Sequence, residues 1–188
     1  PYLESVFVGY RYYLSADKQV RFPFGHGLSY TSFEFSDLQL SQSELKPGET
    51  LEVRVNIKNS GHRAGKAVAQ LYLSAPKTVL FKAERELKDF TKVSLEPGET
   101  GAVSLSVSYE DLAFWNSLSH QWQVEGGKYQ ILVGNSCSAL PLRAEIRVSP
   151  SADSADVPDF REQAGQYCDL PQEPFEFSLE EFEKLPGS

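Results

Sequence analysis

The sequence predicts an all-β fold, an antiparallel sandwich of two sheets followed by an acidic, partly helical C-terminal tail. Two observations carry this prediction: short segments in which apolar and polar residues alternate, and turn signals between those segments. Alternation with a period of two is typical of a strand that has one face in the core and the other in water. About seven such strands, with a single helical turn among them, favour a sandwich.

The alternation is clear in six segments. They are residues 31–40 (TSFEFSDLQL), 50–59 (TLEVRVNIKN), 66–75 (KAVAQLYLSA), 101–109 (GAVSLSVSY), 127–135 (GKYQILVGN) and 140–148 (LPLRAEIRV). In the first of them the apolar face shifts at Ser36 and Asp37, which predicts a β-bulge. Residues 66–75 are apolar enough to form a central strand.

Two similar turn sequences lie fifty residues apart, LKPGET at 45–50 and LEPGET at 95–100, and each leads into a predicted strand. Proline fixes φ at the second position of a turn and glycine accepts a positive φ at the third, so both predict type II turns. The only helical candidate before the tail is one turn in residues 108–118, with Ser108 as its N-cap. The Cys-Trp-Cys spacing of antibody domains is absent, so the sequence favours a fibronectin type III-like sandwich over an antibody-type one.

Charge is distributed unevenly along the chain. The whole net charge of −8 lies in residues 151–188, which contain ten acidic residues and only two basic ones, Arg161 and Lys184. Residues 1–150 have no net charge. Phosphate binding needs clustered basic residues, so nucleic acid and anionic membrane surfaces are excluded as partners. No apolar run approaches the roughly 20 residues that cross a bilayer.

The tail shows a second apolar signal. Residues 177–185 (FSLEEFEKL) predict a short amphipathic helix capped by Ser178. We expect Phe175, Phe177, Phe182 and Leu185 to dock on a surface, either of this domain or of another one. The absence of methionine and the start at Pro1 favour a piece of a longer polypeptide.

Catalytic, cofactor-binding and metal-ligating residues are not predicted. His26 and Ser29 lie in GHGLS, but a nucleophile elbow centres a serine between its glycines and leads into a helix, whereas a strand follows here. The lack of a helix also argues against a phosphate cradle. The carboxylates of Asp37, Glu84 and Glu86 are interpreted as solvated surface groups.

The spacing of the histidines and cysteines predicts no metal site. His26, His62 and His120 form no ligand pair, and Cys137 and Cys168 are interpreted as two free thiols. Aromatic residues offer one further possibility, because sugar-binding modules stack pyranose rings on exposed aromatic side chains. Trp115, Trp122, Tyr72 and Tyr129 are available, and core packing is the expectation for each, with Tyr129 placed by its alternation and Trp122 beside Val124. Trp115 is the possible sugar contact.

Two opening stretches carry a family resemblance. YLESVFVGYRYY (2–13) and RFPFGHGLSYTSFEF (21–35), followed by ERELKDFTKVSLEPGET (84–100) and DLAFWN (111–116), resemble the C-terminal fibronectin type III-like domain of glycoside hydrolase family 3 β-glucosidases and the join that precedes it. The resemblance extends from Tyr2 to Val148. One departure is Glu4-Ser5, where the family usually has Glu-Gly.

The resemblance implies a domain organisation and a parent enzyme. Residues 1–20 would end an α/β sandwich domain and its joining segment, 21–150 would form the β-sandwich, and 151–188 the acidic linker and tail. The parent would be a retaining β-glucosidase acting on terminal non-reducing β-D-glucosyl residues, its nucleophile an Asp of a (β/α)8 barrel and its acid-base a Glu of the α/β domain. Neither segment occurs here, so no catalytic residue carries over.

The function implied for this chain is therefore that of a non-catalytic accessory domain. It would stabilise and orient the catalytic domains of the same polypeptide, which bind the carbohydrate substrate, and no cofactor is expected. The residues expected to pack between domains are Phe22, Phe24, Leu28 and Tyr30. A carbohydrate-binding module and a protein-interaction domain remain as alternatives.

Overall fold

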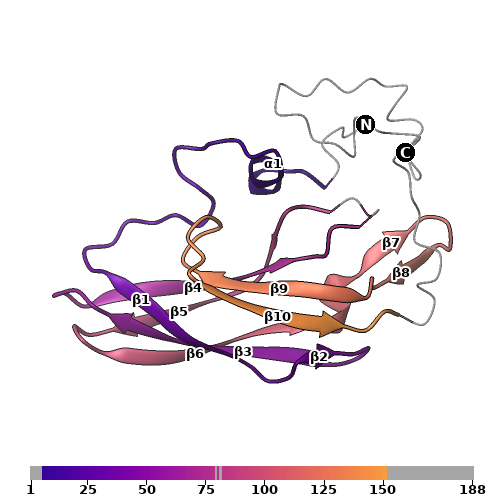
Figure 1. Cartoon of the computed structure of the whole chain (residues 1–188). Helices are drawn as coiled ribbons and strands as arrows, with labels where there is room; N and C mark the ends of the chain where they lie inside the picture. The colour runs from indigo at the N-terminus through magenta and orange to yellow at the C-terminus, as the bar shows by residue number, and fades with distance from the viewer. Residues whose placement is uncertain (1–5, 79, 81, 152–188) are drawn as a thin grey trace.

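The computed structural model describes residues 6–78, 80 and 82–151. Two sheets face each other (Figure 1). Sheet I has the order β1 (Phe33–Leu40), β3 (Thr50–Asn59), β6 (Thr100–Ser108), and sheet II has the order β2 (Glu44–Leu45), β10 (Leu142–Val148), β9 (Gly127–Gly134), β4 (Gly65–Ser74), β5 (Glu86–Leu95). The remaining elements are helix α1 (Tyr10–Ser15), the 3-10 turn η1 (Tyr109–Leu112) and a hairpin of β7 (Phe114–Asn116) and β8 (Gln121–Gln123). The predicted all-β sandwich is confirmed.

The core lies between the two sheets and consists of the predicted apolar faces. From sheet I it takes Leu51, Val53, Val55, Ile57, Leu105 and Val107, and from sheet II Ala67, Ala69, Leu71, Leu73, Tyr129, Ile131, Val133, Ile146 and Val148. Each set occupies alternate positions of its strand, because successive side chains of a strand point to opposite faces. Burial of these side chains is the main driving force for folding.

The predicted bulge and turns are present. The β1–β3 pairing shifts register between Ser36 and Gln39, and Asp37 has a φ of 55°. Gly48 and Gly98 have φ values of 78° and 77°, as the third position of a type II turn requires. Each turn closes through the same two bonds: in the first, the amide of Glu49 donates to the carbonyl of Lys46 at 3.0 Å, and the Glu49 carboxylate accepts from the Lys46 amide at 2.9 Å.

The helical turn after β6 is also confirmed. Ser108 is the N-cap of η1, and its amide donates to the Asp111 carboxylate at 2.8 Å. The Tyr109 hydroxyl then donates to the carbonyl of Ser149 at 2.9 Å, which ties this turn to the end of β10.

Four features differ from the prediction. Helix α1 and strand β5 were not predicted individually, and β2 pairs with β10 in parallel rather than antiparallel fashion. The prediction that Trp122 lies in the core is wrong, because Trp122 is 68% exposed on the β7–β8 hairpin. This two-stranded hairpin is packed through its other face, on which Gln123 is buried.

The predicted tail lies outside the described residues, as do its apolar positions Phe175, Phe177, Phe182 and Leu185. None of the helices in the described part of the chain is long and apolar enough to cross a membrane.

Candidate functional site

The outer face of sheet II, away from the sandwich core, holds the N-terminal segment. Figure 1 shows α1 on the side of this sheet opposite to sheet I. Beneath it lies a second apolar cluster of Tyr72, Leu132, Cys137 and Leu140, against which Tyr10, Leu14 and Leu87 pack. Sheet II is therefore covered on both faces at β4 and β9, which explains why these strands are apolar on both sides.

Tyr10 is the main contact of α1 with the sheet. Its ring stacks on Phe24 with centroids 4.5 Å apart and meets the edge of Tyr72 at 6.2 Å. Its hydroxyl oxygen accepts a 2.8 Å bond from the amide of Leu87 on β5. One side chain thus joins the helix, the following loop and two strands of the sheet.

Charged residues support the same contact. Arg11 of α1 lies 3.4 Å from Glu86, which also pairs with Lys88 at 2.9 Å. Burial opposes ionisation of Glu86, but the charges of Lys88 and Arg11 outweigh it, and the pKa of this carboxyl lies below its usual value. Glu86 is therefore a structural ion-pair partner and holds α1 on β5.

The loop after α1 is fixed by a hydrogen-bond network centred on Gln70 of β4. The Gln70 amide nitrogen donates to the carbonyls of Asn135 at 2.7 Å and Gly25 at 3.3 Å, while its oxygen accepts from the Tyr72 hydroxyl at 2.6 Å. Burial raises the pKa of Tyr72, with smaller contributions from neighbouring Cys137 and Tyr10. Tyr72 therefore acts here as a neutral hydrogen-bond donor.

The backbone conformation and close contacts at position 25 require a glycine. It has a φ of 81°, and a Cβ at this position would collide with the side-chain amide of Gln70. Next to it, the carbonyl of Phe24 accepts a 2.9 Å bond from the amide of Cys137. The glycine lets the loop backbone lie directly on the side chains of the sheet.

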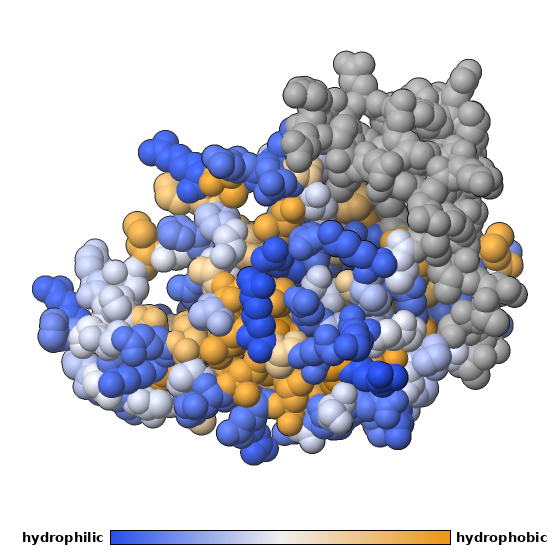
Figure 2. Space-filling view, in the orientation of Figure 1, coloured by the Kyte–Doolittle hydropathy of each residue, from blue (hydrophilic) through white to orange (hydrophobic). Residues whose placement is uncertain are grey.

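The residues expected to pack between domains all lie in this fixed loop. Leu28 is 94% exposed, Tyr30 92%, Phe22 64% and Phe24 46%. Phe24 is partly covered by Tyr10, and Phe22 stacks on His26 with ring centroids 5.6 Å apart. Leu28 and Tyr30 are almost fully exposed. Figure 2 shows hydrophobic residues, in orange, between hydrophilic ones, in blue, on the face of the molecule that it draws. The loop thus presents apolar side chains from a backbone that is hydrogen-bonded to Cys137 at Phe24 and to Gln70 at Gly25.

Trp115, the possible sugar contact, lies on the β7–β8 hairpin and is 50% exposed. It pairs directly across the hairpin with Trp122, and the two rings meet edge to face with centroids 5.6 Å apart. The structure thus brings both tryptophans onto one exposed face, far along the chain from Phe22 and Leu28.

The candidates for acid-base chemistry are scattered. The carboxylate of Asp37 accepts hydrogen bonds from Asn56 and Ser36, which lower its pKa, and Glu84 pairs with Arg85 at 3.7 Å. The hydroxyl of Ser29 accepts from the amide of Thr31 at 3.3 Å. Among the described residues, no three His, Cys, Asp or Glu side chains form a group that could hold a metal ion.

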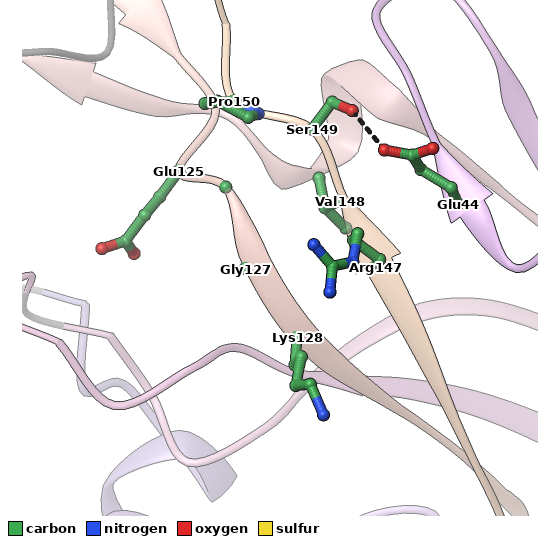
Figure 3. A pocket seen from close by; sticks show the side chains of 9 residues that line it. Glu44, Glu125, Gly127, Lys128, Arg147, Val148, Ser149 and Pro150 are labelled. Carbon is green, nitrogen blue, oxygen red and sulfur yellow. Dashed lines mark hydrogen bonds between the residues drawn. The ribbon is translucent and has the colours of Figure 1, made fainter.

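A hollow of about 480 Å³ lies where β9 begins and β10 ends. Figure 3 shows Glu44 and Glu125 on opposite sides of it, with Lys128 and Arg147 between them. Glu44 accepts a 2.9 Å bond from the Ser149 hydroxyl, and Glu125 pairs with Lys82 at 2.7 Å. Glycoside hydrolysis needs two carboxyl groups directed toward each other across a sugar, whereas Figure 3 shows the Glu125 carboxylate turned away from Glu44.

Known proteins are similar to this chain in sequence and in fold. Residues 67–137 match the model of the fibronectin type III-like domain. The chain is 40% identical over 148 residues to the thermostable β-glucosidase B of Acetivibrio thermocellus, covering 79% of this chain and 20% of that protein. The fold and this match therefore place residues 67–137 in the class of fibronectin type III-like domains.

Two solved structures extend the comparison. β-Glucosidase 3B from Thermotoga neapolitana, in complex with α-D-glucose, is 44% identical with a TM-score of 0.71, over 78% of this chain and 20% of that one. The GH3 β-glucosidase of Bifidobacterium adolescentis is 31% identical with a TM-score of 0.74, over 86% of this chain and 24% of that one. The chain thus contains a fibronectin type III-like domain over residues 67–137 and is homologous to one part of glycoside hydrolase family 3 β-glucosidases, of whose length it spans about a fifth.

The residues that fix the N-terminal loop were not singled out from the sequence. Tyr10 lies far along the chain from Gln70 and Tyr72 of β4. Only the outer face of residues 66–75 carries a signal in the sequence, since Val68 and Tyr72 make that strand apolar on both sides. A strand that is covered on both faces typically has apolar residues on both of its sides. The sequence does not tell which segment covers the second face.

Proposed function

We propose that this chain is the non-catalytic accessory domain of a glycoside hydrolase family 3 β-glucosidase that hydrolyses terminal non-reducing β-D-glucosyl residues. Its role is to stabilise and orient the catalytic domains of the same polypeptide, with residues 1–20 joining them to the sandwich of 21–150. One observation carries the proposal. The loop is hydrogen-bonded to sheet II through Gly25, whereas its side chains Phe22, Leu28 and Tyr30 are largely exposed to solvent.

Burial of these side chains against a neighbouring domain would stabilise the assembly. Apolar area removed from water contributes about 25 cal/mol per Å², so three large side chains contribute several kcal/mol at most. The hydrogen bonds that hold the loop backbone at Phe24 and Gly25 limit the ways in which a neighbour fits. A sugar pocket must be held to within roughly 0.5 Å, and an oriented support of this kind serves that need.

The test compares two sets of substitutions in the full-length parent enzyme. Phe22→Ser, Leu28→Ser and Tyr30→Ser together are expected to speed thermal inactivation several-fold. Phe90→Ser is the matched control, because Phe90 is similarly exposed, at 65%, on β5 instead of the loop. Inactivation of the triple variant at the wild-type rate, or equal effects of both variants, contradicts the proposal. The isolated chain is expected to leave an aryl β-glucoside uncleaved.

A carbohydrate-binding module is the second candidate, and the exposure of Trp115 favours it. Titration of the chain with β-glucan oligosaccharides measures this directly. Binding at millimolar or lower concentration that is lost in Trp115→Ala would replace the scaffold function by sugar binding.

A further inference from the structure

The β7–β8 hairpin presents a second apolar surface that the proposed function does not use. The rings of Trp115 and Trp122 and the adjoining Leu118, which is 61% exposed, form a surface that we call the Trp115–Trp122 face. The opposite face of the hairpin is turned inward: Asn116 and Gln123 are buried there, and the Asn116 amide donates to the Gln123 oxygen at 2.8 Å. The hairpin is therefore held in place with its aromatic residues outward.

The chain leaves the sandwich beside this face. The amide of Ser151 donates to the carbonyl of Val124 at 3.1 Å, and its hydroxyl accepts from the Val124 amide at 3.4 Å. Val124 directly follows β8, two residues after Trp122. Ser151, the last described residue before the tail, therefore lies next to the hairpin that carries the two rings.

The segment that starts there has a composition suited to this face. Residues 152–188 contain five large aromatic side chains, Phe160, Tyr167, Phe175, Phe177 and Phe182, although this part of the chain is strongly acidic. A chain of n residues reaches up to about 3.3 Å × n, so every one of these side chains is within reach. A short tether also gives a local concentration of about millimolar, which makes even weak contacts effective.

The geometry of the two rings favours aromatic side chains over a sugar. A pyranose stacks on one flat platform, whereas the planes of Trp115 and Trp122 stand at 69° to each other. Aromatic side chains favour edge-to-face and offset contacts, which such an angled pair offers on two sides. Large exposed apolar patches mark sites of interaction.

We propose that the Trp115–Trp122 face is covered by the chain's own tail, through Phe175, Phe177 and Phe182. The occupant is thus a segment of this same polypeptide, tethered through Ser151. This proposal does not depend on the loop of Phe22 and Leu28, and its test uses no substitution there.

Tryptophan fluorescence tests it directly, because Trp115 and Trp122 are the only two tryptophans of the chain. In the full chain, Phe175→Ala, Phe177→Ala and Phe182→Ala together are expected to shift the emission to longer wavelength. They should also raise the acrylamide quenching constant at least twofold. The matched control is Glu180→Gln with Glu181→Gln, which changes the charge of the same segment and keeps its aromatic residues, and it should retain the wild-type spectrum.

Three outcomes overturn the proposal. The first is wild-type emission already typical of water-exposed tryptophan, and the second is an unchanged spectrum and quenching in the triple alanine variant. The third is a spectral shift of the wild-type chain on addition of cello-oligosaccharides, which would make the face a sugar platform. Circular dichroism of every variant confirms that the sandwich is folded.

Discussion

The hydroxyl of Tyr72 donates a 2.6 Å hydrogen bond to the side-chain oxygen of Gln70, two residues earlier on the outer face of β4. This bond orients the Gln70 amide so that its nitrogen meets the carbonyls of Asn135 and Gly25. Both side chains are buried, although they lie outside the sandwich core. The pair therefore joins the N-terminal loop to the sheet and positions the exposed side chains that follow it.

Replacement of Gln70 tests this network. Gln70→Ala is expected to lower the free energy of unfolding by about 2–3 kcal/mol, because it leaves the Tyr72 hydroxyl and two carbonyls without their partner. Urea denaturation measures the loss. Gln130→Ala, at an exposed glutamine on β9, is the matched control and should stay within about 0.5 kcal/mol of wild type. Equal effects of the two variants would contradict the role of Gln70.

The two glycines of the loop provide a second test. Gly25→Ala is expected to cost about 1–3 kcal/mol, because its positive φ disfavours a side chain and its Cβ would displace Gln70. Gly27→Ala meets no atom within 4 Å and should be close to neutral. Thermal unfolding of both variants separates these effects, and a neutral Gly25→Ala would show that the loop does not need this backbone conformation.

Cys137 reports on opening of the N-terminal segment, because it is a buried free thiol under Phe24 and close to α1. In a Cys168→Ser background, Tyr10→Ala is expected to speed labelling of Cys137 by a disulfide reagent about 5–30-fold, since it removes about 1–2 kcal/mol of ring contacts. Tyr10→Phe keeps both ring contacts and loses only the acceptor for the Leu87 amide, so its effect should be smaller. Equal labelling rates in all three proteins would show that α1 does not protect the thiol.

Alkaline pH should weaken the fold through Tyr72. Its pKa is raised in the folded state, so its contribution is fully present below the unfolded pKa of about 10 and is lost as the pH rises above it. The expected loss approaches about 1.4 kcal/mol per pH unit for this group. Urea denaturation between pH 8 and 11 measures it, and Tyr72→Phe should reduce the slope, whereas Tyr30→Phe, at an exposed tyrosine, should retain it.

The sandwich itself could be predicted because its signals are local. Leu51 to Ile57 alternate along one strand, and the Pro-Gly pairs at 47–48 and 97–98 determine turns through their own backbone preferences. The bulge at Asp37 was visible for the same reason, as a shift of the apolar face within one segment. Such patterns need no knowledge of what lies across the domain.

Side-chain placement outside the core was harder to predict. Trp122 was expected beside Val124 in the core, but it forms part of a two-stranded hairpin that has one face in solvent. Helix α1 was not predicted, since half of its six residues are aromatic and its N-terminus lacks a side-chain cap. Aromatic residues are only moderate helix formers, so packing of Tyr10 against the sheet stabilises this turn instead of intrinsic propensity.

The sequence by itself determined the all-β class, the strands of the core, both Pro-Gly turns and the neutral sandwich with its acidic tail. It did so because alternation, turn chemistry and charge are properties of neighbouring residues. Only the tertiary structure decided that helix α1 lies on the outer face of sheet II, that Gln70 binds the backbone of Gly25, and that Trp115 and Trp122 share one exposed face. The hydrogen bond between Gln70 and Gly25 joins residues 45 positions apart, and such long-range pairing leaves no pattern within any single segment. Trp115 and Trp122 lie closer in the chain, but their shared face depends on the register of the β7–β8 hairpin.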